Sequence, residues 1–153
     1  MRIGFLINPI AGMGGRVGLK GTDGVADQAV ALGAEPVAPG KALGTLRFLR
    51  ALLERDAAPP EISWLTCSGA MGHAALEAAG FEDVKVVHNA ETSTSTRDTE
   101  KAVRAFLDRE VDLIVFCGGD GTARDIAAIV DETVPILGIP SGVKMYSGVF
   151  GVS

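Results

Sequence analysis

"VDLIVFCGGDGTARDIAAIV", residues 111–130, is the stretch of sequence that decides the fold. An apolar run stops at two glycines, an acid and a third glycine follow, and apolar residues then recur at helical spacing. An uninterrupted apolar run is typical of a strand buried on both faces of a parallel sheet. A strand that passes through a glycine turn directly into a helix is the repeating unit of such a sheet.

The same succession of apolar run and helical segment recurs along the whole chain. Strands are expected at residues 2–8, 35–38, 61–67, 84–88, 111–117 and 134–140, and helices at 24–34, 44–56, 71–80, 97–110 and 122–132. We therefore expect an α/β fold, a doubly wound, mostly parallel sheet of about six strands with helices on both faces, in a Rossmann-like three-layer sandwich.

The domain organisation is expected to change near residue 140. Residues 1–140 would form one α/β domain, and residues 141–153 would begin the connection to a further C-terminal domain. A terminal helix with Tyr146, Val149 and Phe150 turned inward explains the last segment equally simply.

The composition is that of an ordinary globular domain. The chain has 153 residues, of which 47% are hydrophobic and 22% charged, enough for a real core. A net charge of -5 without a Lys/Arg run argues against nucleic-acid binding, and no apolar run approaches a membrane span. Cys67 and Cys117 have no CxxC partner, so we expect buried thiols, a cytoplasmic location and no protein metal site.

Turns rich in Gly, Ser and Thr gather at one predicted edge of the sheet. Open parallel sheets bind ligands beyond the carboxyl ends of their strands, at a switch in strand order. The turns at those ends are "NPIAGMGGRVGLKGTDG" (8–24), "CSGAMG" (67–72), "NAETSTSTRD" (89–98), "GGDGT" (118–122) and "PSGVK" (140–144). The turns at the opposite ends are plainer, which indicates one ligand-binding edge.

The first of these turns is a candidate phosphate loop. Glycines let backbone N–H groups approach an anion closely, and phosphate is the natural guest. The spacing matches neither a Walker A loop nor a dinucleotide fingerprint, so a plain surface loop explains the glycines equally well. The candidate binding residues here are Gly12, Gly14, Gly15 and Lys20.

The turn "GGDGT" carries a stronger signal, because Asp120 stands among glycines at the end of a buried strand. A carboxylate beside phosphates is repelled by them, so it needs a further role. Asp120 either binds Mg²⁺, accepts a proton from an attacking hydroxyl, or caps the helix that follows. Thr122 either caps that helix or donates to a phosphate oxygen.

The hydroxyl-rich turn before residue 97 has two explanations. Thr92 and Ser93 are candidate phosphate contacts. The alternative is a capping box, with Ser95 or Thr96 as the cap and Thr99 or Glu100 near it.

Three segments carry a resemblance to a known family. "GGDGT" after a buried strand resembles the signature of the superfamily of NAD kinases, diacylglycerol kinases and sphingosine kinases. Together with "NPIAGMGGRVGLKGTDG" and "GIPSGVKMYSGVFG", it resembles the ATP-NAD kinase-like proteins of bacteria and archaea. The three segments span residues 8–151, so the resemblance covers almost the whole chain.

The resemblance implies a two-domain kinase. Its N-terminal α/β domain carries "GGDGT", and a β-rich second domain supplies most of the site for the NAD nucleoside. ATP or polyphosphate is the implied donor, with Mg²⁺, and NAD is the implied substrate. Asp120 matches the base that activates the ribose 2′-hydroxyl of NAD. The implied nucleotide contacts are Gly118, Gly119, Gly121, Thr122, Asn8 with the loop to Gly24, and Lys144.

The resemblance leaves the acceptor open. The asparagine-glutamate motif of NAD kinases lies in the second domain, outside residues 1–153, so these residues do not fix NAD as the acceptor. A kinase for another hydroxyl, on a lipid or a small metabolite, stays an alternative, as does a nucleotide-binding module without catalysis. The expected partners are small nucleotides, neither nucleic acid nor membrane, and homo-oligomer formation stays open.

Overall fold

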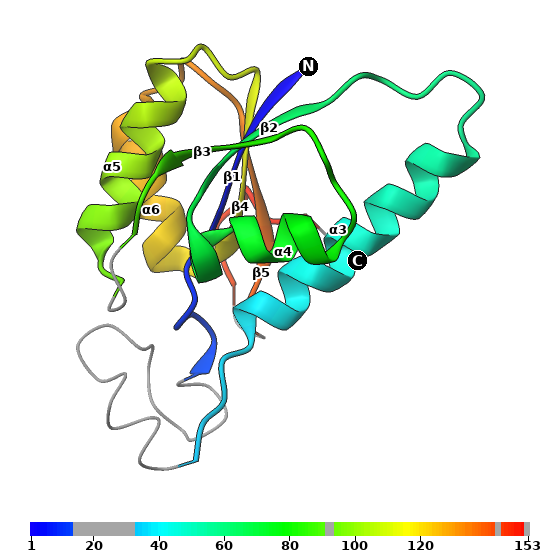
Figure 1. Cartoon of the computed structure of the whole chain (residues 1–153). Coiled ribbons are helices and arrows are strands. Elements are labelled where there is room, and N and C mark those ends of the chain that lie inside the picture. The colour runs from blue at the N-terminus through cyan, green and yellow to red at the C-terminus, as the bar shows by residue number, and fades with distance from the viewer. Residues whose placement is uncertain (14–32, 91–93, 143–144, 152–153) are drawn as a thin grey trace.

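Five parallel strands form the centre of the protein (Figure 1) in a computed structural model that describes residues 1–13, 33–90, 94–142 and 145–151. Their order in the sheet is β3-β2-β1-β4-β5, and neighbouring strands are parallel throughout. The strands are β1 (Arg2–Ile7), β2 (Ser63–Cys67), β3 (Val84–His88), β4 (Leu113–Gly118) and β5 (Ile136–Pro140). The predicted doubly wound α/β architecture is confirmed, with five strands instead of about six.

Helices cover both faces of this sheet (Figure 1). α5 (Thr96–Leu107) and α6 (Asp120–Val130) pack on one face, and α3 (Ala38–Arg55) and α4 (His73–Ala78) pack on the other. A short 3-10 helix, η1 (Gly69–Met71), follows β2. Within the described ranges, no helix combines the length and the apolar character that crossing a membrane requires.

Each face of the sheet has its own core. Phe106 of α5 packs over β1, where a Cβ on Gly4 would lie 2.7 Å from the ring, so the glycine lets α5 approach the sheet centre. On the other face Trp64 is buried and meets Phe5 edge-on. The strands are apolar on both sides because both sides are covered, which is why the sequence shows runs and no alternation.

The two cysteines are buried, as the sequence predicts, one in each core. Burial raises the pKa of the Cys67 thiol to about 12, with a smaller contribution from Asp98. Burial likewise raises the pKa of the Cys117 thiol to about 12. Both side chains therefore remain protonated at neutral pH and act as small apolar groups.

The strand predicted at residues 35–38 is wrong, because α3 begins at Ala38. Pro39 lies in the first turn of α3, where its missing N–H costs nothing. Ala38, Ala42 and Leu46 form the buried face of the helix at a spacing of four residues. Alanines are weak markers of an apolar face, so the first half of α3 is hard to recognise from sequence. The helix predicted at 24–34 lies almost entirely outside the described residues.

The segment after β5 returns to the sheet edge and forms no helix in its described part, residues 145–151. The backbone N–H of Gly138 donates to the Val149 carbonyl at 2.8 Å, and the N–H of Gly151 donates to the Gly138 carbonyl at 3.0 Å. Phe150 packs against Phe116, with 5.7 Å between ring centroids. Val149 and Phe150 thus turn inward as expected, whereas Tyr146 is 83% exposed, against expectation.

Candidate functional site

The switch in strand order lies between β1 and β4. From β1 the chain proceeds to β2 and β3 on one side of the sheet and then to β4 and β5 on the other. The turns that follow β1 and β4 therefore diverge from neighbouring strand ends, where ligands bind in sheets of this kind. The N–H of Asn8 donates to the Cys117 carbonyl at 2.9 Å, so the first turn begins beside "GGDGT".

The side chain of Asn8 links these two turns. Its Nδ2 donates to the hydroxyl of Thr122 at 3.0 Å, and its Oδ1 accepts from the N–H of Ile10 at 3.3 Å. Thr122 is buried, in the first turn of α6. Asn8 and Thr122 are brought together as predicted, but their polar atoms are bonded to each other, and Thr122 is not the helix cap.

The glycines of the site differ in whether the packing of the protein requires a glycine there. A Cβ on Gly118 would lie 2.7 Å from the Cβ of Thr122, and a Cβ on Gly12 would collide with the Ser141 carbonyl oxygen. Gly12 also has a φ of +84°, which favours glycine. At Gly119 the nearest described atom is Met145 Cε at 3.6 Å, an ordinary contact. Protein packing therefore explains Gly12 and Gly118, and it does not explain Gly119.

Asp120 begins α6 and does not cap it. Gly119 is the N-cap, so Asp120 occupies the first helical position and the helix starts two residues before the predicted one. Asp120 Oδ1 accepts from Ser147 Oγ at 2.6 Å and from the Ser147 N–H at 2.9 Å. The N–H of Tyr146 lies 3.1 Å from both carboxylate oxygens. The carboxylate thus joins the start of α6 to the segment that returns to β5.

The environment of Asp120 favours its charged form. The hydroxyl of Ser147, its backbone N–H and the N–H of Tyr146 lower the pKa of the Asp120 carboxyl, with a smaller contribution from Arg124, and together they outweigh the partial burial. The first turn of a helix also stabilises a negative charge. Asp120 is therefore ionised throughout the neutral range.

The remaining predicted site residues divide into two groups. Gly121 lies in the first turn of α6, beside Asp120. Gly14, Gly15, Lys20, Thr92, Ser93 and Lys144 fall outside the described residues.

Ser147 and Tyr146 are contacts that sequence reasoning missed. The segment "GIPSGVKMYSGVFG" carries part of the family resemblance, but nothing in its pattern pairs a serine with an acid 27 positions earlier. The only sequence signal is a hydroxyl residue in a segment expected beyond the last strand.

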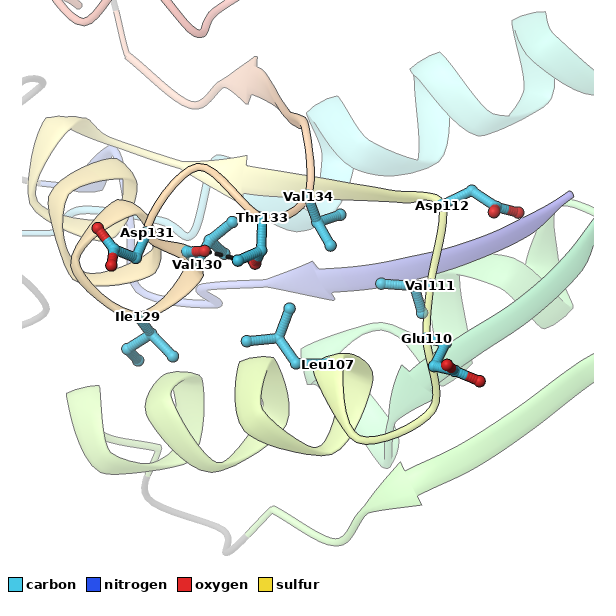
Figure 2. A pocket seen from close by; sticks show the side chains of 9 residues that line it. All are labelled: Leu107, Glu110, Val111, Asp112, Ile129, Val130, Asp131, Thr133 and Val134. Atoms are coloured by element: carbon cyan, nitrogen blue, oxygen red, sulfur yellow. Dashed lines mark hydrogen bonds between the residues drawn. The ribbon is translucent and has the colours of Figure 1, made fainter.

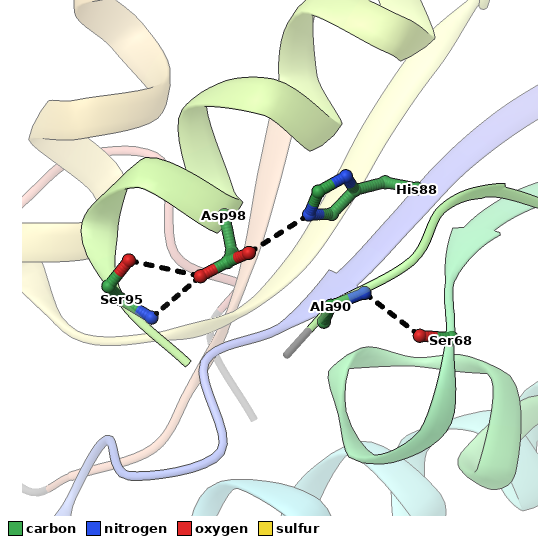
Figure 3. Close-up of polar contacts among 5 residues, drawn as sticks. All are labelled: Ser68, His88, Ala90, Ser95 and Asp98. Carbon is green, nitrogen blue, oxygen red and sulfur yellow. Dashed lines mark hydrogen bonds and ion pairs between the residues drawn. The ribbon is translucent and has the colours of Figure 1, made fainter. Parts of the chain in front are cut away.

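A second carboxylate, Asp98 in the first turn of α5, lies beside the end of β3 (Figure 3). Asp98 Oδ1 is 3.1 Å from His88 Nε2, and Asp98 Oδ2 accepts from the N–H and the hydroxyl of Ser95, each at 3.0 Å. Ser95 is the cap of α5, as one alternative predicted, and its partner is Asp98 in place of Thr99 or Glu100. Burial raises the pKa of Asp98, but the bonds from His88 and Ser95 outweigh it and hold the pKa below its usual value.

A pocket of about 620 Å³ lies at the opposite end of the strands, between the ends of α5 and α6 (Figure 2). Its charged lining residues are all acidic, so it repels phosphate, and none of the predicted site residues contributes to it. It is lined by Leu107, Glu110, Val111, Asp112, Ile129, Val130, Asp131, Thr133 and Val134.

Comparison with known proteins gives one match. The family model of the ATP-NAD kinase N-terminal domain matches residues 3–153, which is nearly the whole chain. No curated protein and no solved structure matches. The family match agrees with the resemblance that the three sequence segments carry.

Proposed function

The chain belongs to the ATP-NAD kinase N-terminal domain family, and from this premise we propose that it is the N-terminal domain of an NAD kinase. The reaction is the transfer of a phosphoryl group from ATP, or from polyphosphate, to the 2′-hydroxyl of NAD, which gives NADP. Asp120 is the residue that orients the 2′-hydroxyl and accepts its proton.

The observation that carries this proposal is the position of Asp120. Its carboxylate lies at the start of α6, beside the switch between β1 and β4. Two of the segments that carry the family resemblance meet there, because Asn8 of the first donates a hydrogen bond to Thr122 of "GGDGT". It is ionised, as a proton acceptor must be.

The low pKa of Asp120 defines how it acts. Phosphoryl transfer passes through a loose transition state and depends mainly on positioning and charge stabilisation. The acceptor oxygen forms a bond to the transferred phosphorus, the bond from phosphorus to the leaving oxygen of ADP breaks, and the hydroxyl proton passes to Asp120. Asp120 therefore orients the hydroxyl and receives its proton late, because a weak base does not remove it early.

The turn beside Asp120 suits a phosphate donor. No packing against the described residues requires a glycine at position 119, and we propose that its bare backbone makes a close phosphate contact. Within the described ranges, no group of three or more His, Cys, Asp or Glu side chains is arranged to hold a metal ion. We expect a Mg²⁺ ion to be held by the donor phosphates, with Asp120 as a carboxylate that could contact it. Magnesium supplies charge neutralisation for the phosphates.

We place the choice of acceptor in a second domain that follows residues 1–140. The family's description as an N-terminal domain supports this division. The return of residues 149–151 to the edge of β5 is consistent with residues 141–153 as the start of the connection.

The proposal is tested with the full-length protein, γ-labelled ATP and magnesium. We expect label in NADP, at the 2′-position, when NAD is supplied. A panel of lipid and small-metabolite alcohols serves as the comparison set. Label in one of these with NAD unreactive would identify a kinase for another acceptor. Tight ATP binding by calorimetry without turnover of any acceptor would identify a binding module.

A further inference from the structure

The two oxygens of the Asp120 carboxylate accept hydrogen bonds unequally, with four donor–acceptor contacts between them. Oδ1 receives the hydroxyl and the N–H of Ser147 and shares the N–H of Tyr146. Among the described residues, Oδ2 receives only the shared Tyr146 N–H, at 3.1 Å. A carboxylate oxygen has two lone pairs, so Oδ1 is saturated and Oδ2 keeps the capacity to accept a further hydrogen bond.

We propose that Ser147 is a positioning residue, which anchors Asp120 through Oδ1 so that Oδ2 is presented to the acceptor hydroxyl. This inference rests on the proposed function, because it assigns the reacting oxygen of the same carboxylate. It adds a residue from the segment after β5 to a site that the strand-end turns alone would define.

The geometry favours anchoring through the serine. The Ser147 Oγ to Asp120 Oδ1 distance of 2.6 Å is that of a strong hydrogen bond from a hydroxyl to an ionised carboxylate. The neighbouring N–H groups of Tyr146 and Ser147 are fixed by the return of the chain to the edge of β5, where Val149 and Gly151 are bonded to Gly138. Two independent attachments thus hold the donors in place, one at the sheet and one at the carboxylate.

The side chain of Tyr146 has no part in this anchor. It is 83% exposed, and its contribution is the backbone N–H alone. Arg124, one turn along α6, acts on Asp120 through its charge and does not fix the direction of the carboxylate. Ser147 therefore supplies the only side-chain donor to Asp120 among the described residues.

The test compares Ser147→Ala and Ser147→Thr in the full-length protein, with Ser63→Ala as a matched control. Ser63 donates its hydroxyl to Asp83, also a serine–aspartate bond, but it lies at the start of β2, away from the switch point. We expect kcat for NAD phosphorylation to fall roughly tenfold in Ser147→Ala, with the KM for ATP unchanged. Ser147→Thr should restore kcat because it keeps the hydroxyl, and Ser63→Ala should leave it unchanged.

A second readout does not require turnover. In protein labelled with ¹³C at aspartate carboxyls, NMR titration should place the pKa of Asp120 below the ordinary value of 3.8, and Ser147→Ala should raise it. The acid limb of the kcat profile should move to higher pH in the same variant. If the serine were merely structural, Ser147→Ala would change the melting temperature and would move neither the pKa of Asp120 nor the acid limb of the kcat profile.

Two outcomes overturn the positioning role. One is an unchanged kcat and an unchanged Asp120 titration in Ser147→Ala. The other is an increased kcat, which would mean that Ser147 competes with the acceptor for the carboxylate. If NAD is never phosphorylated but the titration shifts as expected, the proposed function fails and the anchor of Asp120 stands.

Discussion

Asp98 and Asp120 are two carboxylates at the same edge of the sheet, and they are held in different ways. The partners of Asp98 are local: Ser95 belongs to the same capping box, and His88 ends the strand just before it. The partners of Asp120 come from a segment 26 to 27 residues away. Asp98 has both oxygens engaged by side-chain partners, whereas one oxygen of Asp120 receives only the shared N–H of Tyr146 within the part of the chain that the structure describes.

The difference separates a structural acid from a reactive one. A carboxylate with one oxygen bonded to its own helix cap and the other to the end of the preceding strand stabilises that local structure and has little left to offer a ligand. A carboxylate held through one oxygen, at a switch in strand order, is oriented and still able to accept. Ionisation alone does not distinguish them, because the pKa is lowered in both.

The largest expected effect is the loss of catalysis in Asp120→Asn. The amide oxygen keeps the bonds to Ser147, but the NH₂ group replaces the accepting oxygen. We expect NADP formation by the full-length protein to fall about 10²- to 10⁴-fold, with little change in melting temperature. Asp98→Asn is the matched control, since it makes the same chemical change at the structural carboxylate.

Steady-state kinetics measure both variants. Turnover of Asp120→Asn near the wild-type rate would remove Asp120 from the reaction. An equal loss of turnover in Asp98→Asn would erase the distinction between the two acids.

The next effect is on stability and concerns Asp98→Ala. The change removes the partner of Ser95 and leaves the half-buried His88 without its carboxylate. We expect the free energy of unfolding to fall by about 2 kcal/mol, the sum of a lost cap and a lost hydrogen bond. Asp98→Asn should cost less, because its amide oxygen still accepts from Ser95.

Urea unfolding followed by circular dichroism measures this difference. Equal stability of the alanine variant and the wild type would show that the Asp98 cluster contributes nothing to the fold.

The glycines before Asp120 sharpen the comparison within one turn. Gly118→Ala places a Cβ 2.7 Å from the Cβ of Thr122, so we expect a loss of about 1–3 kcal/mol in the free energy of unfolding. Among the described residues, a Cβ in Gly119→Ala meets only the Met145 side chain, at 3.6 Å, so the variant should keep nearly the same stability. Its KM for ATP should rise, because the added methyl group occupies the space proposed for a phosphate.

Thermal melts and initial-rate assays separate the two glycine variants. An unaltered KM for ATP in Gly119→Ala would argue that the donor does not approach this turn.

Much of this architecture is predictable because it depends on local patterns. The strand β4 is an apolar run, and the turn that follows carries three glycines around one acid. The strand, the turn and the candidate role of Asp120 can therefore all be predicted from the sequence. The start of α3 is less so, because its buried face is made of Ala38 and Ala42, which resemble surface residues in a pattern of hydrophobicity.

The contacts of Asp120 were not predictable for a different reason. Ser147 reaches the carboxylate only because the chain doubles back along β5, and that path depends on backbone bonds at Gly138 and on the packing of Phe150. No periodicity within residues 141–151 encodes this return. Side-chain pairs that depend on the path of a connection therefore emerge only in three dimensions, as the His88 to Asp98 pair also does across the turn before α5.

The smallest expected effect is on the pH dependence of stability. The pKa of Asp98 is lower in the folded chain than its ordinary value of 3.8, so the unfolded chain binds a proton first as the pH falls. The stabilisation that Asp98 gives the folded chain is complete above pH 3.8 and is lost as the pH falls through the pKa of Asp98 in the folded chain. In Asp98→Asn this part of the acid-induced loss should disappear, so its free energy of unfolding should depend less on pH below about 4.

Urea unfolding between pH 6 and pH 3 measures this dependence. Asp120 has a lowered pKa too, so Asp120→Asn should reduce the same slope. The reduction should be smaller in a Ser147→Ala background, where only the backbone N–H groups of Ser147 and Tyr146 still hold the carboxylate. Slopes that do not change in any of the three variants would show that neither carboxylate is stabilised by its partners in solution. A reduced slope in Asp98→Asn alone would mean that Asp120 exchanges between Ser147 and water, which weakens the anchor and strengthens the contrast between the two acids.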